Sequence, residues 1–233
     1  MTLHATLSDA GGLPLDFPAE PVTARPSGAL WAPRLRLLAV ADLHLGRSER
    51  MARRGGPLLP PHENAATLDR LQAEIDALRP ETVVCAGDSF DDDAAAEAMD
   101  FGRLRAMAQG RRWVWLLGNH DPDPQAAPGE RAREWRAGGL TFRHIAQDDA
   151  EPGEVSGHYH PKATLILRGR RIVRRCFLHD RRRVILPAFG AYVGGLDATD
   201  AAFDALLGPG ARALLLGPRV TAAPRSALKP RIL

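Results

Sequence analysis

The first half of the chain alternates apolar runs of strand length with segments whose apolar residues recur at helical spacing. One helical segment runs from the N-cap candidate Asn64 to the stop signal Pro80, and a second covers residues 94–109. The apolar runs are Leu35–Ala41, Thr82–Ala86 and Trp113–Leu117. Uninterrupted apolar character is typical of strands that are covered on both faces. The order of these segments predicts an α/β fold with a parallel sheet.

The second half of the chain changes to short strand candidates separated by turns, with one helical segment at Phe203–Leu207. The strand candidates are Leu140–His144, Glu154–Ser156, Ala163–Leu167, Arg171–Phe177, Val184–Pro187 and Ala213–Leu216. We expect them to form a second sheet on the first, within a single domain covering residues 1–233. No internal repeat is visible.

Three stretches carry no clear periodicity. Residues 1–33 are rich in Pro and Gly and predict an irregular lead-in with one strand at Ala29–Trp31. The polar, Gly- and Pro-rich residues 47–61 predict a loop. Residues 221–233 read as a tail that either docks a partner or frays.

Composition excludes several classes of protein. The chain has 233 residues, of which 45% are hydrophobic, and this suits one globular domain. It lacks the roughly 20 consecutive apolar residues that a membrane span needs, and residues 1–20 lack the features of a signal peptide. Cys85 ends an apolar run and Cys176 is distant from it, which favours buried thiols over a disulfide or a metal knuckle. We therefore expect a cytoplasmic protein.

Positive charge is concentrated in one segment. The net charge of the whole chain is +3, but residues 161–183 contain nine basic residues and one acidic residue. Such asymmetry favours a polyanionic partner, with a general preference for arginine as the alternative explanation. The chain contains neither a P-loop nor a GxGxxG motif, so nucleotide-driven motors and dinucleotide enzymes have no support.

Four polar clusters each follow a predicted strand. They are Asp42-Leu43-His44, Gly87–Asp91, Gly118–Asp121 and Gly157–His160. Each one alone is compatible with an ordinary turn or helix cap. Because ligands collect at the carboxyl ends of strands in open α/β sheets, the four together predict a metal site. Carboxylate, imidazole and amide donors without thiolate suit Mn, Fe or Zn.

These clusters resemble the motifs of the calcineurin-like binuclear metallophosphoesterases, which are DxH, GDxxD, GNH(D/E), a separate His and GHxH. The corresponding stretches here are ADLHLG, GDSFD, GNHD, RHIA and SGHYHP, between Leu35 and His160. The resemblance implies a four-layer αββα sandwich of two packed mixed β-sheets flanked by helices. It also implies two divalent metal ions, with Mn²⁺ expected first and Fe or Zn as alternatives.

A narrower resemblance extends over most of the chain. The stretches ALWAPRLRLLAVADLHLG, GPLLPPHENAATLDRL and VSGHYHPKATL–RRCF are similar to bacterial ligase-associated DNA-damage-response endonucleases. That family implies cleavage of single-stranded DNA in DNA repair. It also implies functional association with an ATP-dependent DNA ligase, a helicase and an exonuclease-like protein.

The resemblance also assigns roles to residues. Asp42, His44, Asp88 and His160 would hold one metal, and Asp88 would bridge to a second metal held by Asn119, His144 and His158. His144 is assigned only by its place 14 residues before His158, and a strand-end histidine bonded to backbone is the alternative. His120 would be the catalytic histidine that is not a ligand. Asp91 would orient His120, with a solvated acidic turn as the alternative.

The implied chemistry is hydrolysis of a phosphodiester. Two cations about 3.5–4 Å apart neutralise the diester and supply a bridging hydroxide as nucleophile. Protonated His120 would donate to the leaving oxygen, and such an acid contributes roughly 10²–10⁴-fold to the rate.

Substrate contacts are the least constrained by the sequence. Arg47, Arg50, Arg53 and Arg54 would bind flanking phosphates, unless they belong to a solvated loop. Two rival functions stay open: a phosphoesterase of small or cyclic nucleotides, and a non-catalytic metal-binding scaffold for the ligase or helicase.

Overall fold

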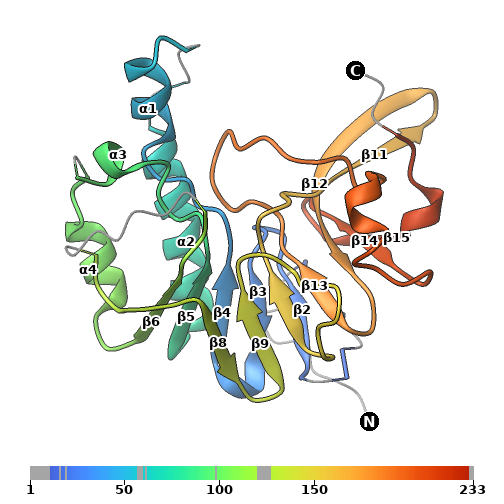
Figure 1. Cartoon of the computed structure of the whole chain (residues 1–233), viewed down its shortest axis with the longest axis horizontal. Coiled ribbons are helices and arrows are strands. Elements are labelled where there is room, and N and C mark those ends of the chain that lie inside the picture. The colour runs from blue at the N-terminus through green and yellow to red at the C-terminus, as the bar shows by residue number, and fades with distance from the viewer. Residues whose placement is uncertain are drawn as a thin grey trace.

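The computed structural model describes residues 11–15, 17–18, 20–56, 60, 62–97, 99–119 and 127–230, with the side chain of Leu167 left out. These residues form two β-sheets (Figure 1). The first sheet has the strand order β1-β2-β3-β4-β5-β6-β7. Its strands are β1 (Leu13–Leu15), β2 (Val22–Ala24), β3 (Leu30–Ala32), β4 (Leu37–Val40), β5 (Thr82–Ala86), β6 (Arg112–Leu116) and β7 (Glu130–Ala132).

The second sheet has the strand order β15-β14-β12-β13-β10-β9-β8, and β11 pairs with β12 outside this path. Its strands are β8 (Glu134–Ala137), β9 (Leu140–Arg143), β10 (Glu154–Ser156), β11 (Lys162–Leu167), β12 (Arg170–His179), β13 (Arg183–Ile185), β14 (Arg212–Leu215) and β15 (Thr221–Pro224). Both sheets are mixed. Strands β4, β5, β6 and β7 are parallel in the first sheet, and β9, β10 and β13 are parallel in the second.

The main core lies between the two sheets. In β4 the alternation of a strand sends Leu37 and Ala39 into this core, where they join Phe142 and Val155 of the second sheet. The neighbouring residues Leu38 and Val40 point to the outer face, which packs on helices. Both faces of β4 are therefore apolar, which explains its continuous hydrophobic run.

Helices cover the outer face of the first sheet (Figure 1). They are α2 (Glu63–Leu78), α3 (Asp93–Glu97) and α4 (Gly102–Ala108), while α1 (Arg47–Arg53) projects beside α3. The outer face of the second sheet packs on Phe203, Leu206, Leu207 and Leu228. Near these residues are the 3-10 helices η3 (Ala201–Phe203) and η4 (Arg225–Ala227). Within the described ranges, no helix has the length and apolar character to cross a membrane.

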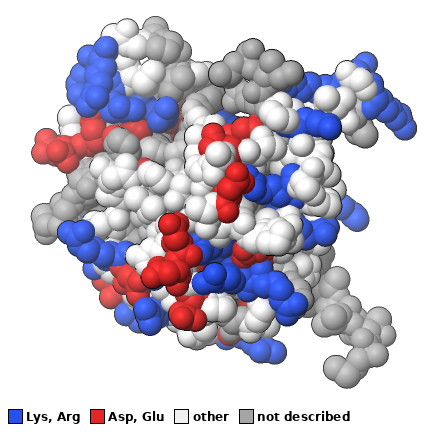
Figure 2. Space-filling view, turned by 45° about the vertical axis from the view of Figure 1, so that its right-hand side comes forward, with Lys and Arg blue, Asp and Glu red and all other residues white. Residues whose placement is uncertain are grey.

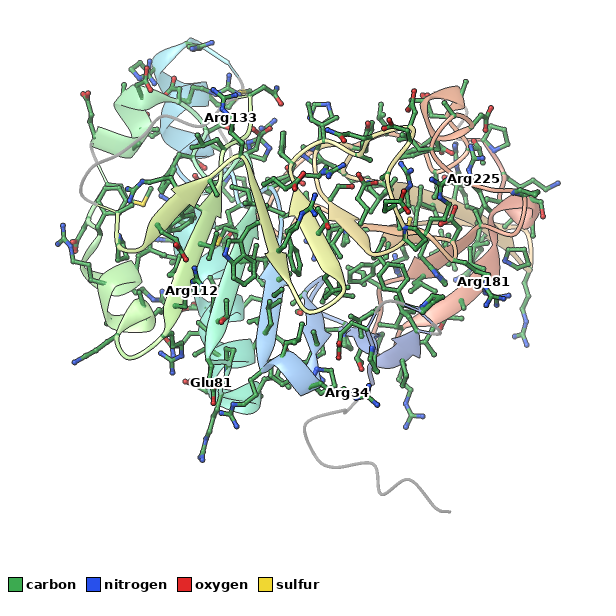
Figure 3. All side chains as sticks on the ribbon, turned by 60° about the horizontal axis from the view of Figure 1, so that its bottom comes forward. Arg34, Glu81, Arg112, Arg133, Arg181 and Arg225 are labelled. Carbon is green, nitrogen blue, oxygen red and sulfur yellow. The ribbon has the colours of Figure 1, made fainter. Side chains whose placement is uncertain are left out.

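The expected layered α/β architecture of two mixed sheets with flanking helices is confirmed. Cys85 and Cys176 are buried free thiols, as expected. Arg34, Glu81 and Arg112 stand at the amino ends of β4, β5 and β6 (Figure 3). The opposite, carboxyl ends of these strands carry the polar clusters.

Four local predictions were wrong. The lead-in contains β1 and β2 besides the expected strand, and the predicted loop at residues 47–61 begins with α1. The predicted helix at 94–109 is divided into α3 and α4, and Asp100 Oδ1 accepts a hydrogen bond from Gly102 N at 2.8 Å where α4 begins. The expected tail begins as β15, which pairs with β14 along its whole length.

The N-terminus of α2 also differs from the prediction. His62, with a φ of 80°, occupies the N-cap position that Asn64 was expected to take. Asn64 Oδ1 instead accepts from Gly46 N at 2.8 Å and so ties α2 to the start of α1.

A buried ion network holds the second sheet together. Glu154 and Arg183 face each other across β10 and β13, and both are almost fully buried. Arg183 lies 3.2 Å from one carboxylate oxygen of Glu154, and Arg143 lies 3.0 Å from the other. Removing one partner of such a pair leaves an uncompensated charge in the protein interior.

We therefore expect Glu154→Leu to lower the free energy of unfolding by about 3–5 kcal/mol, measured by urea denaturation. The matched double variant Glu154→Leu/Arg183→Met removes both buried charges and should be more stable than the single variant. A loss below about 1 kcal/mol in Glu154→Leu would show that the network is not a major source of stability.

Candidate metal centre

The predicted metal ligands all follow parallel strands, and they meet at one edge of the two sheets. Asp42 and His44 follow β4, Asp88 follows β5 and Asn119 follows β6. The second sheet contributes three histidines from two adjacent parallel strands: His144 follows β9, and His158 and His160 follow β10. The packing of the two sheets brings the two sets together.

Backbone hydrogen bonds continue the pairing of β4 and β5 into the loops that carry the ligands. Asp42 N donates to Gly87 O, and His44 N donates to Asp88 O, both at 3.0 Å. Leu45 N then donates to Ser89 O, also at 3.0 Å. The two loops therefore act as one paired unit, which fixes the side chains that they carry.

Two groups of potential ligands share Asp88. The first consists of Asp42, His44, Asp88 and His160, and the second of Asp88, His144 and His158. Within each group the ligand atoms all lie within 4.8 Å of one another. The resemblance assigned these residues to two metals, with Asn119 added to the second set, and their role as ligands stays a prediction.

Asn119 belongs to the second group by its contacts. Its Oδ1 lies 2.9 Å from His144 Nε2. The same Nε2 lies 3.1 Å from His158 Nδ1 and 3.5 Å from Asp88 Oδ1. Oxygen and nitrogen atoms with lone pairs thus converge from four residues on one small volume.

The backbone at the site is strained. Five candidate ligands have φ between 45° and 73°, the left-handed region that non-glycine residues rarely adopt: Asp42, His44, Asp88, His158 and His160. Each such residue costs on the order of 1–3 kcal/mol and persists only where its surroundings enforce it. This concentration of strain indicates a functional site rather than ordinary turns.

Two glycines of the motifs lack the side chain that would otherwise collide with candidate ligands. A Cβ on Gly87 would lie 2.1 Å from His144 Nδ1, and a Cβ on Gly118 would lie 2.2 Å from Asp88 Oδ1. Each motif glycine therefore gives room to a ligand from a different motif.

The hydrogen bonds of two histidines suit metal binding. His44 Nδ1 lies 2.9 Å from Asp91 Oδ1, and His144 Nδ1 lies 3.2 Å from Ala86 O. If each Nδ1–H donates to its oxygen, each Nε2 presents a lone pair to the site, an arrangement typical of metal-bound histidines. The donor set of carboxylates, imidazoles and an amide oxygen therefore fits a divalent cation.

The electrostatics agree with this donor set. Burial, followed by the neighbouring His144 imidazole, lowers the pKa of His158, which keeps its ring neutral and able to bind a cation. Burial alone would raise the pKa of Asp91, but hydrogen bonds from His44 and Arg50 outweigh it and hold this pKa below its ordinary value. Asp91 is therefore an ionised carboxylate.

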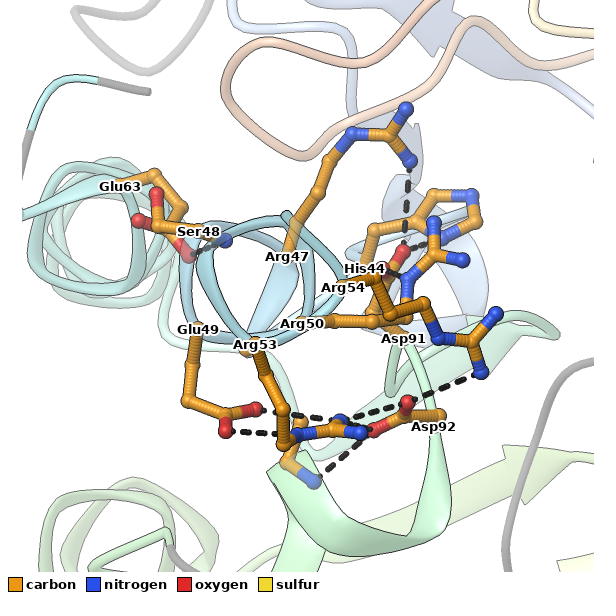
Figure 4. Close-up of polar contacts among 12 residues, drawn as sticks. His44, Arg47, Ser48, Glu49, Arg50, Arg53, Arg54, Glu63, Asp91 and Asp92 are labelled. Carbon is orange, nitrogen blue, oxygen red and sulfur yellow. Dashed lines mark hydrogen bonds and ion pairs between the residues drawn. The ribbon is translucent and has the colours of Figure 1, made fainter. Parts of the chain in front are cut away.

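Asp91 contacts residues that the sequence did not connect with it. It was expected to orient His120, which lies outside the described residues. In the structure Asp91 binds His44, Arg50 and, at 3.3 Å, Arg47 (Figure 4). Only 4% of Asp91 is exposed, so the alternative of a solvated acidic turn is wrong.

The four arginines expected to bind phosphate lie on or directly after α1. Arg47 and Arg50 point to Asp91, whereas Arg53 and Arg54 pair with Asp92 at 2.7 and 3.4 Å (Figure 4). Two carboxylates therefore hold α1 next to the ligands. The alternative of a solvated loop is wrong, and the phosphate-binding role of these arginines stays a prediction.

Comparisons with known proteins agree with this geometry. The family model for calcineurin-like phosphoesterase matches residues 35–183. Among solved structures, the chain is similar to the nuclease MPE of Pseudomonas putida, with 25% sequence identity and a TM-score of 0.70. That match covers 91% of this chain and 100% of the other. No curated protein matches at a significant level.

Because the family model covers more than half of the chain, the protein belongs to the calcineurin-like phosphoesterase family. It is a hydrolase that acts on phosphoester bonds. The family and the clustered Asp and His residues together indicate a site for divalent metal.

We expect Asp91→Asn to weaken Mn²⁺ binding by about 10–100-fold, because a neutral amide supports His44 less well than a carboxylate does. Isothermal titration calorimetry measures this change. Asp92→Asn is the matched control, since Asp92 binds arginines but no candidate ligand. If Asp91→Asn kept its metal affinity and lost turnover at saturating metal, the role of orienting His120 would be favoured instead.

Proposed function

We propose that this phosphoesterase is a metal-dependent nuclease that hydrolyses phosphodiester bonds of single-stranded DNA. The observation that carries the proposal is the pair of ligand groups joined at Asp88. Two cations held by these groups would suit an anionic diester, which resists attack by water unless its charge is neutralised. The structural similarity to a nuclease supports a nucleic acid as the substrate.

Mn²⁺ is the ion that we propose first, with Fe or Zn as alternatives. Asp42, His44, Asp88 and His160 would hold one ion, and Asp88, Asn119, His144 and His158 would hold the second. Oxygen and imidazole donors suit these metals. Both cysteines belong to hydrophobic cores, so thiolate does not contribute to the donor set.

Bound ions would supply charge neutralisation and activated water. Side chains of the protein would orient the ligands, bind the substrate and donate a proton. Asp91 holds His44 in one orientation and retains Arg47 and Arg50 beside the site. Guanidinium groups there would bind phosphate oxygens next to the scissile bond. His120 is proposed to donate a proton to the leaving oxygen.

The biological setting follows from the sequence resemblance. We propose action in bacterial DNA repair in the cytoplasm, in functional association with an ATP-dependent DNA ligase, a helicase and an exonuclease-like protein. The concentrated positive charge of residues 161–183 supports a polyanionic substrate.

The direct test is cleavage of covalently closed, circular single-stranded DNA with Mn²⁺. A closed circle has no ends, so linear product requires an endonuclease. We expect product from the wild type and none from Asn119→Ala, which lacks one candidate ligand. An intact circle together with hydrolysis of small nucleotide diesters would overturn the DNA substrate, and chelation that leaves activity unchanged would overturn metal dependence.

A second test separates catalytic from ligand residues. We expect His120→Ala to lose roughly 10²–10⁴-fold in turnover while it keeps its metal content. Asp88→Ala should lose both, because Asp88 belongs to both ligand groups. Metal content is measured by elemental analysis after gel filtration. Recovery of His120→Ala without metal would contradict the role proposed for His120.

A further inference from the structure

Strands β11 and β12 form a two-stranded ribbon that extends beyond the second sheet (Figure 1). Residues Lys162–Leu167 pair in register with Arg170–Arg175, and β12 pairs with β14 from Cys176 onward. At the base of the ribbon, Lys162 also bridges to Asp197, and Thr164 O accepts a hydrogen bond from Lys229 N at 3.2 Å. Arg168 and Gly169 both have positive φ, as the tightest hairpin turns require. Six residues of strand span about 20 Å. Ala163 and Thr164 are buried, so the exposed part of the ribbon is its outer end, which includes Ile166 and Arg171.

The base of the ribbon lies beside the candidate metal centre. Lys162 comes two residues after His160, and its Nζ donates to Val193 O at 3.0 Å. Val193 belongs to the loop of residues 187–196, which also packs on the ligands: Gly190 N donates to Asp42 O at 3.1 Å. The ribbon, this loop and the metal centre are therefore joined directly.

The ribbon is positively charged along its length. Between residues 161 and 179 there are six basic residues and no Asp or Glu. The basic residues are Lys162, Arg168, Arg170, Arg171, Arg174 and Arg175. Basic side chains gather at the upper right of the space-filling view, where the ribbon projects (Figure 2). A flexible polyanion is the complementary partner for such a surface.

Most of the exposed apolar side chains belong to the ribbon or to the loop at its base. Among the described residues, the exposed large apolar side chains are Ile145, Ile166, Val173, Tyr192 and Leu196. Ile166 and Val173 belong to the ribbon, and Tyr192 and Leu196 belong to the loop of residues 187–196. Ile145 directly follows the candidate ligand His144. Ile166 pairs with Arg171, and Val173 pairs with Thr164. Paired residues share a face of the ribbon, and so do residues two apart in one strand, so Ile166 and Val173 lie on the same face.

Tyr192 is the most informative of these residues. Its side chain is 53% exposed, and its φ of 57° places it in the left-handed region. Tyr192 comes two residues after Gly190, whose backbone N donates a hydrogen bond to Asp42 O. The backbone of Tyr192 therefore lies within about 7 Å of Gly190. Backbone strain at an exposed aromatic residue, in a loop that is hydrogen-bonded to the segment of a candidate ligand, is typical of a ligand-binding position.

We propose that Tyr192 and the β11–β12 ribbon form one binding track for single-stranded nucleic acid leading away from the metal centre. Tyr192 stacks on a base next to the scissile phosphate, and Ile166 and Val173 contact bases farther along. The ribbon arginines bind the intervening phosphates. Aromatic faces combined with cations are how proteins bind unpaired strands, whose bases are free to stack. The inference rests on the proposed nuclease function and specifies how that site selects its substrate.

The test measures binding of a fluorescently labelled single strand by anisotropy in EDTA, so that the result does not depend on cleavage. We expect Tyr192→Ala to bind about 10–100-fold more weakly than wild type, and Tyr192→Phe to bind as wild type does. Since stacking releases no counterions, Tyr192→Ala should keep the wild-type salt dependence. Equal affinity of Tyr192→Ala and Tyr192→Phe would overturn the stacking role.

A second test compares two double variants that remove the same charge, one on the ribbon and one away from it. Arg170→Gln/Arg171→Gln should reduce the slope of log affinity against log salt by about 1.4, since each phosphate contact on a single strand contributes about 0.7. Arg34→Gln/Arg79→Gln removes the same charge at the amino ends of β4 and β5, at the opposite edge of the first sheet, and should bind as wild type does. Equal slopes for the two double variants would overturn the role of the ribbon.

Two further outcomes would contradict the proposal. Duplex DNA that bound as tightly as the single strand, with the same losses in each variant, would show general affinity for polyanions. Variants that changed the sedimentation coefficient but not DNA binding would show that the ribbon associates with a second copy of the chain. A wild type that bound the single strand but left the closed circle intact would refute the nuclease function and not the track.

Discussion

The structure depends on one electrostatic constraint: two buried carboxylates, Asp42 and Asp88, share a corner of the molecule with four imidazoles. Carboxylates are costly to bury unless they are compensated. His158 N donates to Asp42 at 3.0 Å, which offsets part of this cost. The imidazole lone pairs are also close together, however, with His144 Nε2 only 3.1 Å from His158 Nδ1. Divalent cations satisfy both sets of atoms at once, and the parallel strands and left-handed turns serve to hold those atoms in place.

Elements buried on two faces could be predicted from the sequence because burial leaves a continuous apolar run. Strands β5 and β10 were predicted at their observed bounds, and β4 and β6 to within two residues at each end. Asp42, Asp88 and Asn119 each follow such a run, whereas the roles of all the candidate ligands, including His144, His158 and His160, came from the resemblance. The pairing of two sheets then brought together residues as distant as Asp42 and His160, which the motif order implied but periodicity could not show.

The missed features have physical reasons. Strands of three residues, such as β1 and β2, are too short to carry a periodic pattern. Helix α1 is held by ion pairs with Asp91 and Asp92, two residues that are distant in sequence, so its arginines looked like part of a solvated loop. The contact between Asp91 and His44 depends on the pairing of the loops after β4 and β5. Tyr192 carries no motif, and only its exposure and strained backbone distinguish it.

The candidate ligands come from five separate segments between Asp42 and His160, and this spacing has a consequence for the stability of the whole chain. An ion bound by Asp42 and His160 closes a loop of more than 100 residues, as a covalent cross-link would. In a chain-entropy description, a link across a loop of about 100 residues contributes on the order of 4–5 kcal/mol. Because the unfolded chain has no such site, ion binding favours the folded state by mass action. The cell's supply of that ion would then govern how long the protein resists proteolysis as well as how fast it works.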